Sequence, residues 1–153
     1  MKKFQYHMEN ILQVKKKLED QVKIAYGTAR MRLNREEEKL EYMIQKEISY
    51  ENQLRELRSD RLDIMQIKQC EQAVDFMKMN IKQQNIAVKN ATQRLEVARI
   101  RLHDAMVERK TQERLKEKAF DNYKIEYDAE ERKEVDELNS FNYNNSNPDE
   151  EDR

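Results

Sequence analysis

The residues that most often do chemistry in proteins are few in this chain and far apart. His7 and His103 are its two histidines, and Cys70 is its single cysteine. No His-x3-His or Cys-x2-Cys spacing is present, so the sequence predicts no zinc site. Cys70 has no cysteine or histidine near it in the sequence and is expected to be an inert packing residue. A single cysteine excludes an intrachain disulfide and fits a reducing cytoplasmic compartment.

Carboxylates are abundant, as in the run Glu36-Glu37-Glu38 and the cluster around Glu130 and Glu131. A general acid or base needs a desolvated cleft to shift its pKa. A calcium loop needs a glycine for its sharp turn, and the cluster near residue 130 has none. We therefore expect solvated helix faces here, and predict no enzyme activity, no catalytic or metal-binding residue and no cofactor.

The elements that carry these residues are set by the near absence of helix breakers. Gly27 and Pro148 are the single glycine and the single proline of 153 residues. Neither a Walker A loop nor a dinucleotide-binding fingerprint can be built with one glycine. Lys, Glu, Gln, Leu, Arg, Met and Ala dominate and all favour helix. The composition therefore predicts very long α-helices.

The charge balance limits the classes of partner. The net charge is −1, which gives no strong basic field for nucleic acid or for an anionic membrane. No apolar run approaches the ~20 residues that span a bilayer. The two lysines at the N-terminus precede no apolar stretch, so we do not expect a signal peptide.

Apolar residues recur at helical spacing in two segments. In the first segment, about 4–57, the early apolar positions step by three and four residues and the pattern repeats every eleven, which predicts a straight or slightly right-handed stripe. They are Ile11, Val14, Leu18, Val22, Ala25, Ala29, Leu33 and Leu40. From Leu40 to Leu57 the spacing becomes heptad, which is typical of a left-handed coiled coil.

The second segment, about 62–138, has the clearest heptads. We call the line of contact between two paired helices the seam. The residues expected to lie in it are Val74, Met77, Ile81, Gln84, Val88, Ala91, Leu95, Ala98, Leu102 and Ala105. The stripe weakens at Arg109 and Gln112 and is predicted to recover at Leu115, Ala119, Tyr123 and Tyr127.

Between the segments, the apolar phase is lost at Arg58-Ser59-Asp60-Arg61. Ser59 or Asp60 could cap the next helix. We predict an all-α fold, a long antiparallel two-helix coiled coil with its turn near 58–65 and a disordered acidic tail over 139–153. The alternative is one continuous helix of about 135 residues that pairs only between chains. Phe76 and Met79 are expected to be exposed near the turn, and Met43, Met77 and Met106 to fill the seam.

Three stretches together point to a known family. The first has Phe4, Leu12 and Leu18-Glu19 followed by Ala25 and Ala29. The second is Ala105-Met106-Val107-Glu108-Arg109-Lys110 with the charged run after it, and the third is Glu131-Arg132-Lys133-Glu134-Val135-Asp136-Glu137. In order and spacing they resemble the flagellar export protein FliJ family over about residues 4–138.

This resemblance implies a rod similar in shape to the central stalk of rotary ATPases. It implies a cytoplasmic, non-enzymatic component of flagellar type III export, held at the inner face of the cell membrane through its partners. Those partners would be the hexameric flagellar export ATPase, the cytoplasmic domain of the export-gate protein FlhA, and export chaperones. When free, the chain is expected to be a monomer.

The resemblance also implies two sets of partner-binding residues. The ATPase-facing set is Glu108, Arg109, Lys110, Lys133, Asp136 and Glu137. The set in the half near the turn is Tyr50, Ala73, Met77, Asn80 and Gln84. The acidic tail departs from the short basic or polar ending of the family. Two alternatives stay open, a homodimeric coiled-coil spacer and the equivalent stalk protein of a virulence secretion system.

Overall fold

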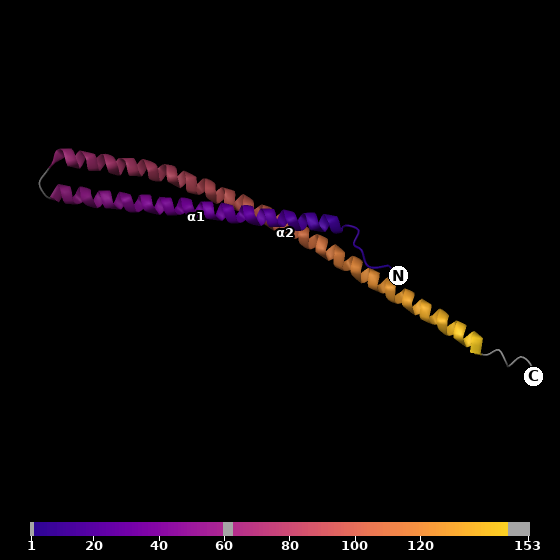
Figure 1. Cartoon of the computed structure of the whole chain (residues 1–153). Coiled ribbons are helices and arrows are strands. Elements are labelled where there is room, and N and C mark those ends of the chain that lie inside the picture. The colour runs from indigo at the N-terminus through magenta and orange to yellow at the C-terminus, as the bar shows by residue number, and fades with distance from the viewer. Residues whose placement is uncertain (1, 60–62, 147–153) are drawn as a thin grey trace, which may run out of the picture. The chain divides into compact units, whose positions relative to one another are not determined.

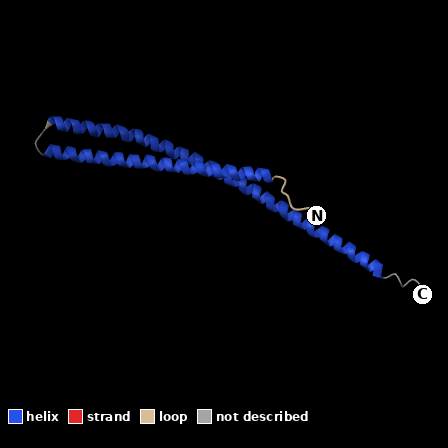
Figure 2. Ribbon diagram, in the orientation of Figure 1, coloured by secondary structure: helices blue, strands red, loops and turns tan. Residues whose placement is uncertain are grey.

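The computed structural model describes residues 2–59 and 63–146 and contains two helices in that part of the chain. Helix α1 is Glu9–Ser59 and helix α2 is Ile64–Ser146 (Figure 1). No strand is present in the described part, as Figure 2 shows. The predicted all-α class is confirmed.

The chain divides into two compact units, and each helix contributes to both. The hairpin unit is Leu18–Ala105, and the terminal unit combines Met1–Lys17 with Met106–Arg153. Each unit has its own packing.

In the hairpin unit, α1 and α2 lie side by side and run in opposite directions (Figure 1). Two contacts fix the register. The Gln84 amide donates to the Glu36 carbonyl at 2.9 Å, and the Cys70 thiol donates to the Tyr50 carbonyl at 3.2 Å. Moving fourteen residues along α1, from Glu36 to Tyr50, moves the partner fourteen residues back along α2, from Gln84 to Cys70. The predicted antiparallel pairing is confirmed.

The inward face of α1 follows a heptad spacing throughout the hairpin unit. The positions at this spacing, all buried or half-buried, are Glu19, Val22, Tyr26, Ala29, Leu33, Glu36, Leu40, Met43, Glu47, Tyr50, Leu54 and Leu57. The predicted eleven-residue repeat is therefore wrong, because Ile11, Val14, Leu18 and Ala25 are exposed. The polar residues Glu19 and Glu36 occupy inward positions, so apolar residues alone indicated the wrong phase in the first half of the helix, whereas the heptad stripe predicted from Leu40 to Leu57 is confirmed.

The predicted seam of α2 is confirmed from Val74 to Ala105, where every residue of that set is buried or half-buried. The same spacing continues through Arg109, Gln112, Lys116, Ala119 and Tyr123, which are half-buried. Leu115 and Tyr127 are exposed, so the predicted recovery at these two positions is wrong. The long aliphatic stem of Lys116 takes the inward place that Leu115 was expected to fill.

The chain reverses between Ser59 and Ile64, within the predicted range, and Asp63 caps α2. Its Oδ1 atom accepts from the backbone N–H of Met65 at 3.1 Å, as expected of an N-cap aspartate. The predicted cap at Ser59 is wrong, because the Ser59 hydroxyl donates to the Glu56 carbonyl at the end of α1. Asp60 lies outside the described residues.

Both outer ends differ from the prediction. Residues 2–8 are not helical, so α1 begins at Glu9 rather than Phe4. Residues 139–146 are helical rather than disordered, since α2 continues to Ser146 instead of ending near Leu138. Adding residues to an existing helix costs little, and no helix breaker occurs before Pro148. The remainder of the predicted tail, 147–153, lies outside the described residues.

Gly27 lies in the middle of α1, is exposed, and has no heavy atom within 4 Å of the position of an added Cβ. Its backbone does not adopt a positive φ. Gly27→Ala is therefore expected to raise the free energy of unfolding by about 1 kcal/mol, because alanine loses less backbone entropy in a helix. Urea unfolding followed by circular dichroism measures the effect. An unchanged or lower midpoint would contradict this account of α1.

Neither described helix contains a stretch long and apolar enough to cross a membrane.

Candidate protein-binding surfaces

In the terminal unit, an aromatic cluster holds the N-terminal segment against α2. The Phe4 ring lies 5.2 Å from the Phe120 ring and 5.4 Å from the Tyr123 ring, measured between centroids. The Tyr123 hydroxyl donates to the Lys2 carbonyl at 2.8 Å. Residues 2–8 leave the helical conformation because Phe4 and Tyr6 can then reach α2 and bury their rings.

Two buried side chains stabilise the same contact one to two turns further along. Leu12 is 1% exposed and is the most deeply buried large side chain of the described residues. Tyr6 is buried, and its hydroxyl donates to Gln112 Oε1 at 3.2 Å. The terminal unit therefore has a small apolar core of its own, built around Leu12.

Ion pairs flank this core on the surface. Lys116 Nζ lies 2.9 Å from Glu9 Oε2, and Lys15 Nζ lies 2.9 Å from Glu108 Oε2. The hydrogen bond from Lys116 lowers the pKa of Glu9 below its usual value. The pairs are partly exposed and are each worth little stability.

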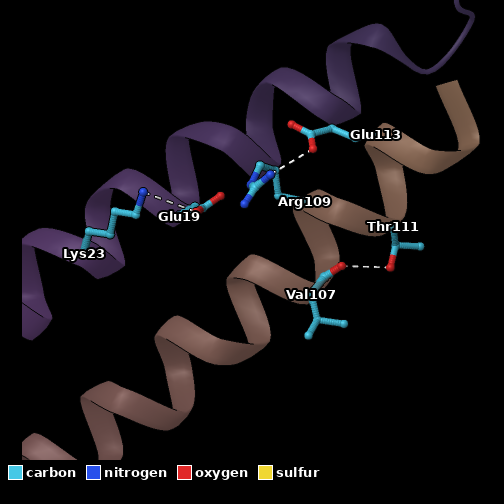
Figure 3. Close-up of polar contacts among 6 residues, drawn as sticks. All are labelled: Glu19, Lys23, Val107, Arg109, Thr111 and Glu113. Atoms are coloured by element: carbon cyan, nitrogen blue, oxygen red, sulfur yellow. Dashed lines mark hydrogen bonds and ion pairs between the residues drawn. The ribbon is translucent and has the colours of Figure 1, made fainter. Parts of the chain in front are cut away.

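The predicted ATPase-facing residues fall into two groups on α2. Glu108 pairs with Lys15, and Lys110 is exposed. Arg109 pairs with Glu113 at 2.8 Å (Figure 3). On α1, Lys23 Nζ lies 3.4 Å from Glu19 Oε1, and this pair is also drawn in Figure 3. Lys133, Asp136 and Glu137 are exposed and begin 23 residues after Lys110, or roughly 35 Å along the helix. The structure does not bring the two groups together, and their role stays a prediction.

The second group belongs to the exposed C-terminal stretch of α2, whose first residues Glu126 and Glu130 line a shallow pocket with the N-terminal segment. Every residue from 124 to 146 is exposed. This stretch, which we call the free helix, carries seven carboxylates and three basic residues, a net charge of −4. Val135, Leu138 and Phe141 are exposed large apolar residues on it. The sequence analysis missed Leu138 and Phe141, although their i, i+3 spacing was a signal, because it ended the helix at Leu138.

The predicted residues near the turn lie around the seam of the hairpin unit. Tyr50, Ala73, Met77 and Asn80 are half-buried. Gln84 is buried, and besides the Glu36 carbonyl it contacts Glu36 Oε2 at 2.5 Å. Packing within the chain thus explains why most of these residues are partly or fully buried. That they contact a partner stays a prediction.

Exposed apolar side chains near the turn do fit a binding surface. Phe76 is 64% exposed and Met79 is 63% exposed, as predicted, and Ile64 and Met65 are more exposed still. We call these four residues the tip patch. Met43, Met77 and Met106 are half-buried, as predicted for seam residues. Cys70 is buried in the seam, as expected of a packing residue.

Comparison with known proteins identifies the family. The family model described as "Flagellar FliJ protein" matches residues 4–148. Searches of curated proteins and of solved structures returned no match. The match covers nearly all of the helical hairpin and the three stretches that carry the resemblance. The chain therefore belongs to the flagellar FliJ protein family, whose members are non-catalytic components of flagellar protein export.

Proposed function

We propose that this chain is a stalk-like coiled coil that binds and stimulates the hexameric flagellar export ATPase. It links the ATPase to the cytoplasmic domain of FlhA and escorts export chaperones. It acts as a monomer, at the cytoplasmic face of the membrane through these partners. The family match supports the flagellar system over the virulence one. The observation that carries the ATPase contact is the free helix, 124–146.

The free helix continues α2, and because all of its residues are exposed it gains little stability from packing within the chain. In the free helix, Leu138 and Phe141 are three residues apart, so they lie on one face and form an exposed apolar pair. Exposed apolar surface of this kind commonly marks a protein-binding site. Contact with a partner would bury both side chains and stabilise the helix.

The charge of the free helix indicates what kind of surface it meets. With a net charge of −4, it is complementary to a basic surface. We infer that the ATPase presents basic side chains around an apolar contact for Leu138 and Phe141. An asymmetric rod would contact the subunits of a symmetric ring unequally, and could bias their occupancy by differences in contact free energy.

The gate contact is assigned to the tip patch. Its four apolar residues, Ile64, Met65, Phe76 and Met79, are exposed and belong to the first turns of α2. Flexible methionine side chains suit a surface that must bind more than one protein. FlhA and export chaperones are the partners that we propose for it.

The ATPase contact is tested by measuring ATP hydrolysis by the purified export ATPase with added chain. Leu138→Ser with Phe141→Ser is expected to remove most of the stimulation, at least tenfold, because the apolar contact is lost. The matched control is Ile125→Ser with Tyr143→Ser. These two residues are as exposed, and they lie on the opposite face of the free helix.

Full stimulation by the Leu138/Phe141 variant would rule out the free helix as the contact. A second arm, Lys110→Glu with Lys133→Glu, tests the charged residues implied by the family. Unchanged stimulation and unchanged motility would remove those residues from the site. Sedimentation of the free chain as a dimer at micromolar concentration would instead favour the homodimeric spacer.

A further inference from the structure

We propose that a groove on the hairpin unit docks an amphipathic helix of a partner protein that carries carboxylates beside its apolar face. The groove is lined by Val22, Ala25 and Ala29 from α1 and by Arg94, Val97 and Arg101 from α2. It shares no residue with the free helix or with the tip patch, and the proposal does not depend on the ATPase contact.

The floor of the groove is apolar because the seam is narrow here. Ala29 and Ala98 are small side chains at inward positions, and Val22 is half-buried beside them. Ala25 is exposed at the rim, and Val97 is 47% exposed. Small side chains let a third helix approach closely, and burying Val97 would supply the apolar contact.

The length of the groove suits a helix. Along α2 its lining runs from Asn90 to Arg101, twelve residues that span roughly 17 Å, which is about three helical turns. Residues that line it on α2 recur three and four positions apart, as they do on one face of a helix. A partner helix of three turns would cover it.

The charges of the groove select the partner. Arg94 and Arg101 are seven residues apart and line the same side, and no Asp or Glu lines the groove. Neither arginine has a carboxylate partner within residues 2–59 and 63–146. By contrast, the neighbouring Arg99 pairs with Glu96 at 2.6 Å. Two guanidinium groups beside an apolar floor are complementary to carboxylates that flank an apolar helix face.

A second copy of this chain is a poorer occupant. In a two-fold symmetric contact the same patch meets itself. Arg94 and Arg101 would then face their own equivalents, and like charges in such positions are destabilising. The groove therefore favours a different protein that supplies the negative charge.

The experiment uses the full chain and a designed helical peptide of about three heptads with a fluorescent label. The peptide has leucine on one face and glutamate at the flanking positions, and the matched peptide has lysine in place of glutamate. Fluorescence anisotropy is expected to show binding of the glutamate peptide, weakened by salt, and at least tenfold weaker binding of the lysine peptide.

Variants locate the binding site. Arg94→Glu with Arg101→Glu is expected to weaken binding of the glutamate peptide at least tenfold. Lys68→Glu with Lys82→Glu makes the same change in net charge at exposed positions outside the groove and should leave binding within about twofold. Ala25→Trp keeps the charges but fills the groove, and is expected to weaken binding of the glutamate peptide. Ile24→Trp, at an exposed neighbouring position, is its control and should bind as the natural chain does. Circular dichroism checks that each variant is folded.

Three results would overturn the proposal. The first is equal binding of both peptides, and the second is full binding by the Arg94/Arg101 variant or by Ala25→Trp. The third is self-association of the chain that Ala25→Trp abolishes, which would assign the groove to a second copy. None of these results would bear on ATPase stimulation through the free helix.

Discussion

Leu12→Ala is expected to lower the free energy of unfolding of the terminal unit by about 3 kcal/mol, since it empties the centre of that unit's core. Leu12 is 1% exposed, whereas its neighbour Ile11 is 43% exposed. Ile11→Ala is therefore a matched control that removes a similar volume. It should lower the free energy of unfolding by well under about 1 kcal/mol. Urea unfolding followed by tyrosine fluorescence measures the change, because four of the seven tyrosines belong to the terminal unit, namely Tyr6, Tyr123, Tyr127 and Tyr143.

This pair of variants also decides between two phases of α1. A stripe with an eleven-residue repeat would place Ile11 inside and Leu12 outside. If Ile11→Ala were the more destabilising of the two, the heptad phase described for α1 would be incorrect.

Glu36 and Gln84 form a polar pair within the hairpin seam. Replacing Gln84 alone is expected to lower the free energy of unfolding, whereas replacing both residues is expected to raise it. Gln84 is buried and donates to both the carbonyl and the carboxylate of Glu36. Gln84→Leu alone should lower the free energy of unfolding by about 1–2 kcal/mol, because it leaves the Glu36 carboxylate without this donor in the seam. The double variant Glu36→Leu with Gln84→Leu should be more stable than the natural chain by about 1 kcal/mol or more, since two apolar residues then pack together.

Thermal and urea unfolding measure both changes. Gln83→Leu, at an exposed neighbouring position, is the control. Its free energy of unfolding should stay within about 0.5 kcal/mol of that of the natural chain. We also expect the double variant to self-associate in sedimentation, because a polar seam residue restricts the pairings that a coiled coil can adopt. A Gln84→Leu chain as stable as the double variant would contradict this role for the pair.

Heptad spacing in the second half of the chain was sufficient to predict the seam of α2. Ten positions from Val74 to Ala105 repeat without a slip, and Gln84 is the one polar residue among them. The lack of glycine and proline predicted long helices, and the loss of apolar phase near Ser59 predicted the reversal. These signals are local, so the sequence alone could reveal them.

The inward face of α1 could not be predicted in the same way. Ala25 and Tyr26 are neighbours, and Tyr26 is the one that is half-buried while Ala25 is exposed. Which of the two turns inward depends on the phase set by α2, including the bond from Gln84 to Glu36. Hydrophobicity alone cannot show that a glutamate belongs in the seam.

The binding surfaces were harder still to predict. The exposure of Phe76 and Met79 followed from their places outside the apolar stripe. The groove beside Arg94 and Arg101 depends on the alignment of two segments about seventy residues apart, which no local pattern encodes. The N-terminal segment is a similar case, because Phe4 is ordered by Phe120 and Tyr123 rather than by its neighbours in sequence.

The equal fourteen-residue steps between Glu36 and Tyr50 and between Gln84 and Cys70 restrict how such a chain can change in length. Deleting one residue from a single arm would rotate everything beyond it by about 100° and turn its inward side chains toward water. A deletion of seven residues from one arm would keep the faces but pair each residue with the wrong neighbour across the seam. Viable shortening or lengthening of the hairpin must therefore remove or add whole heptads in both arms at once, opposite each other.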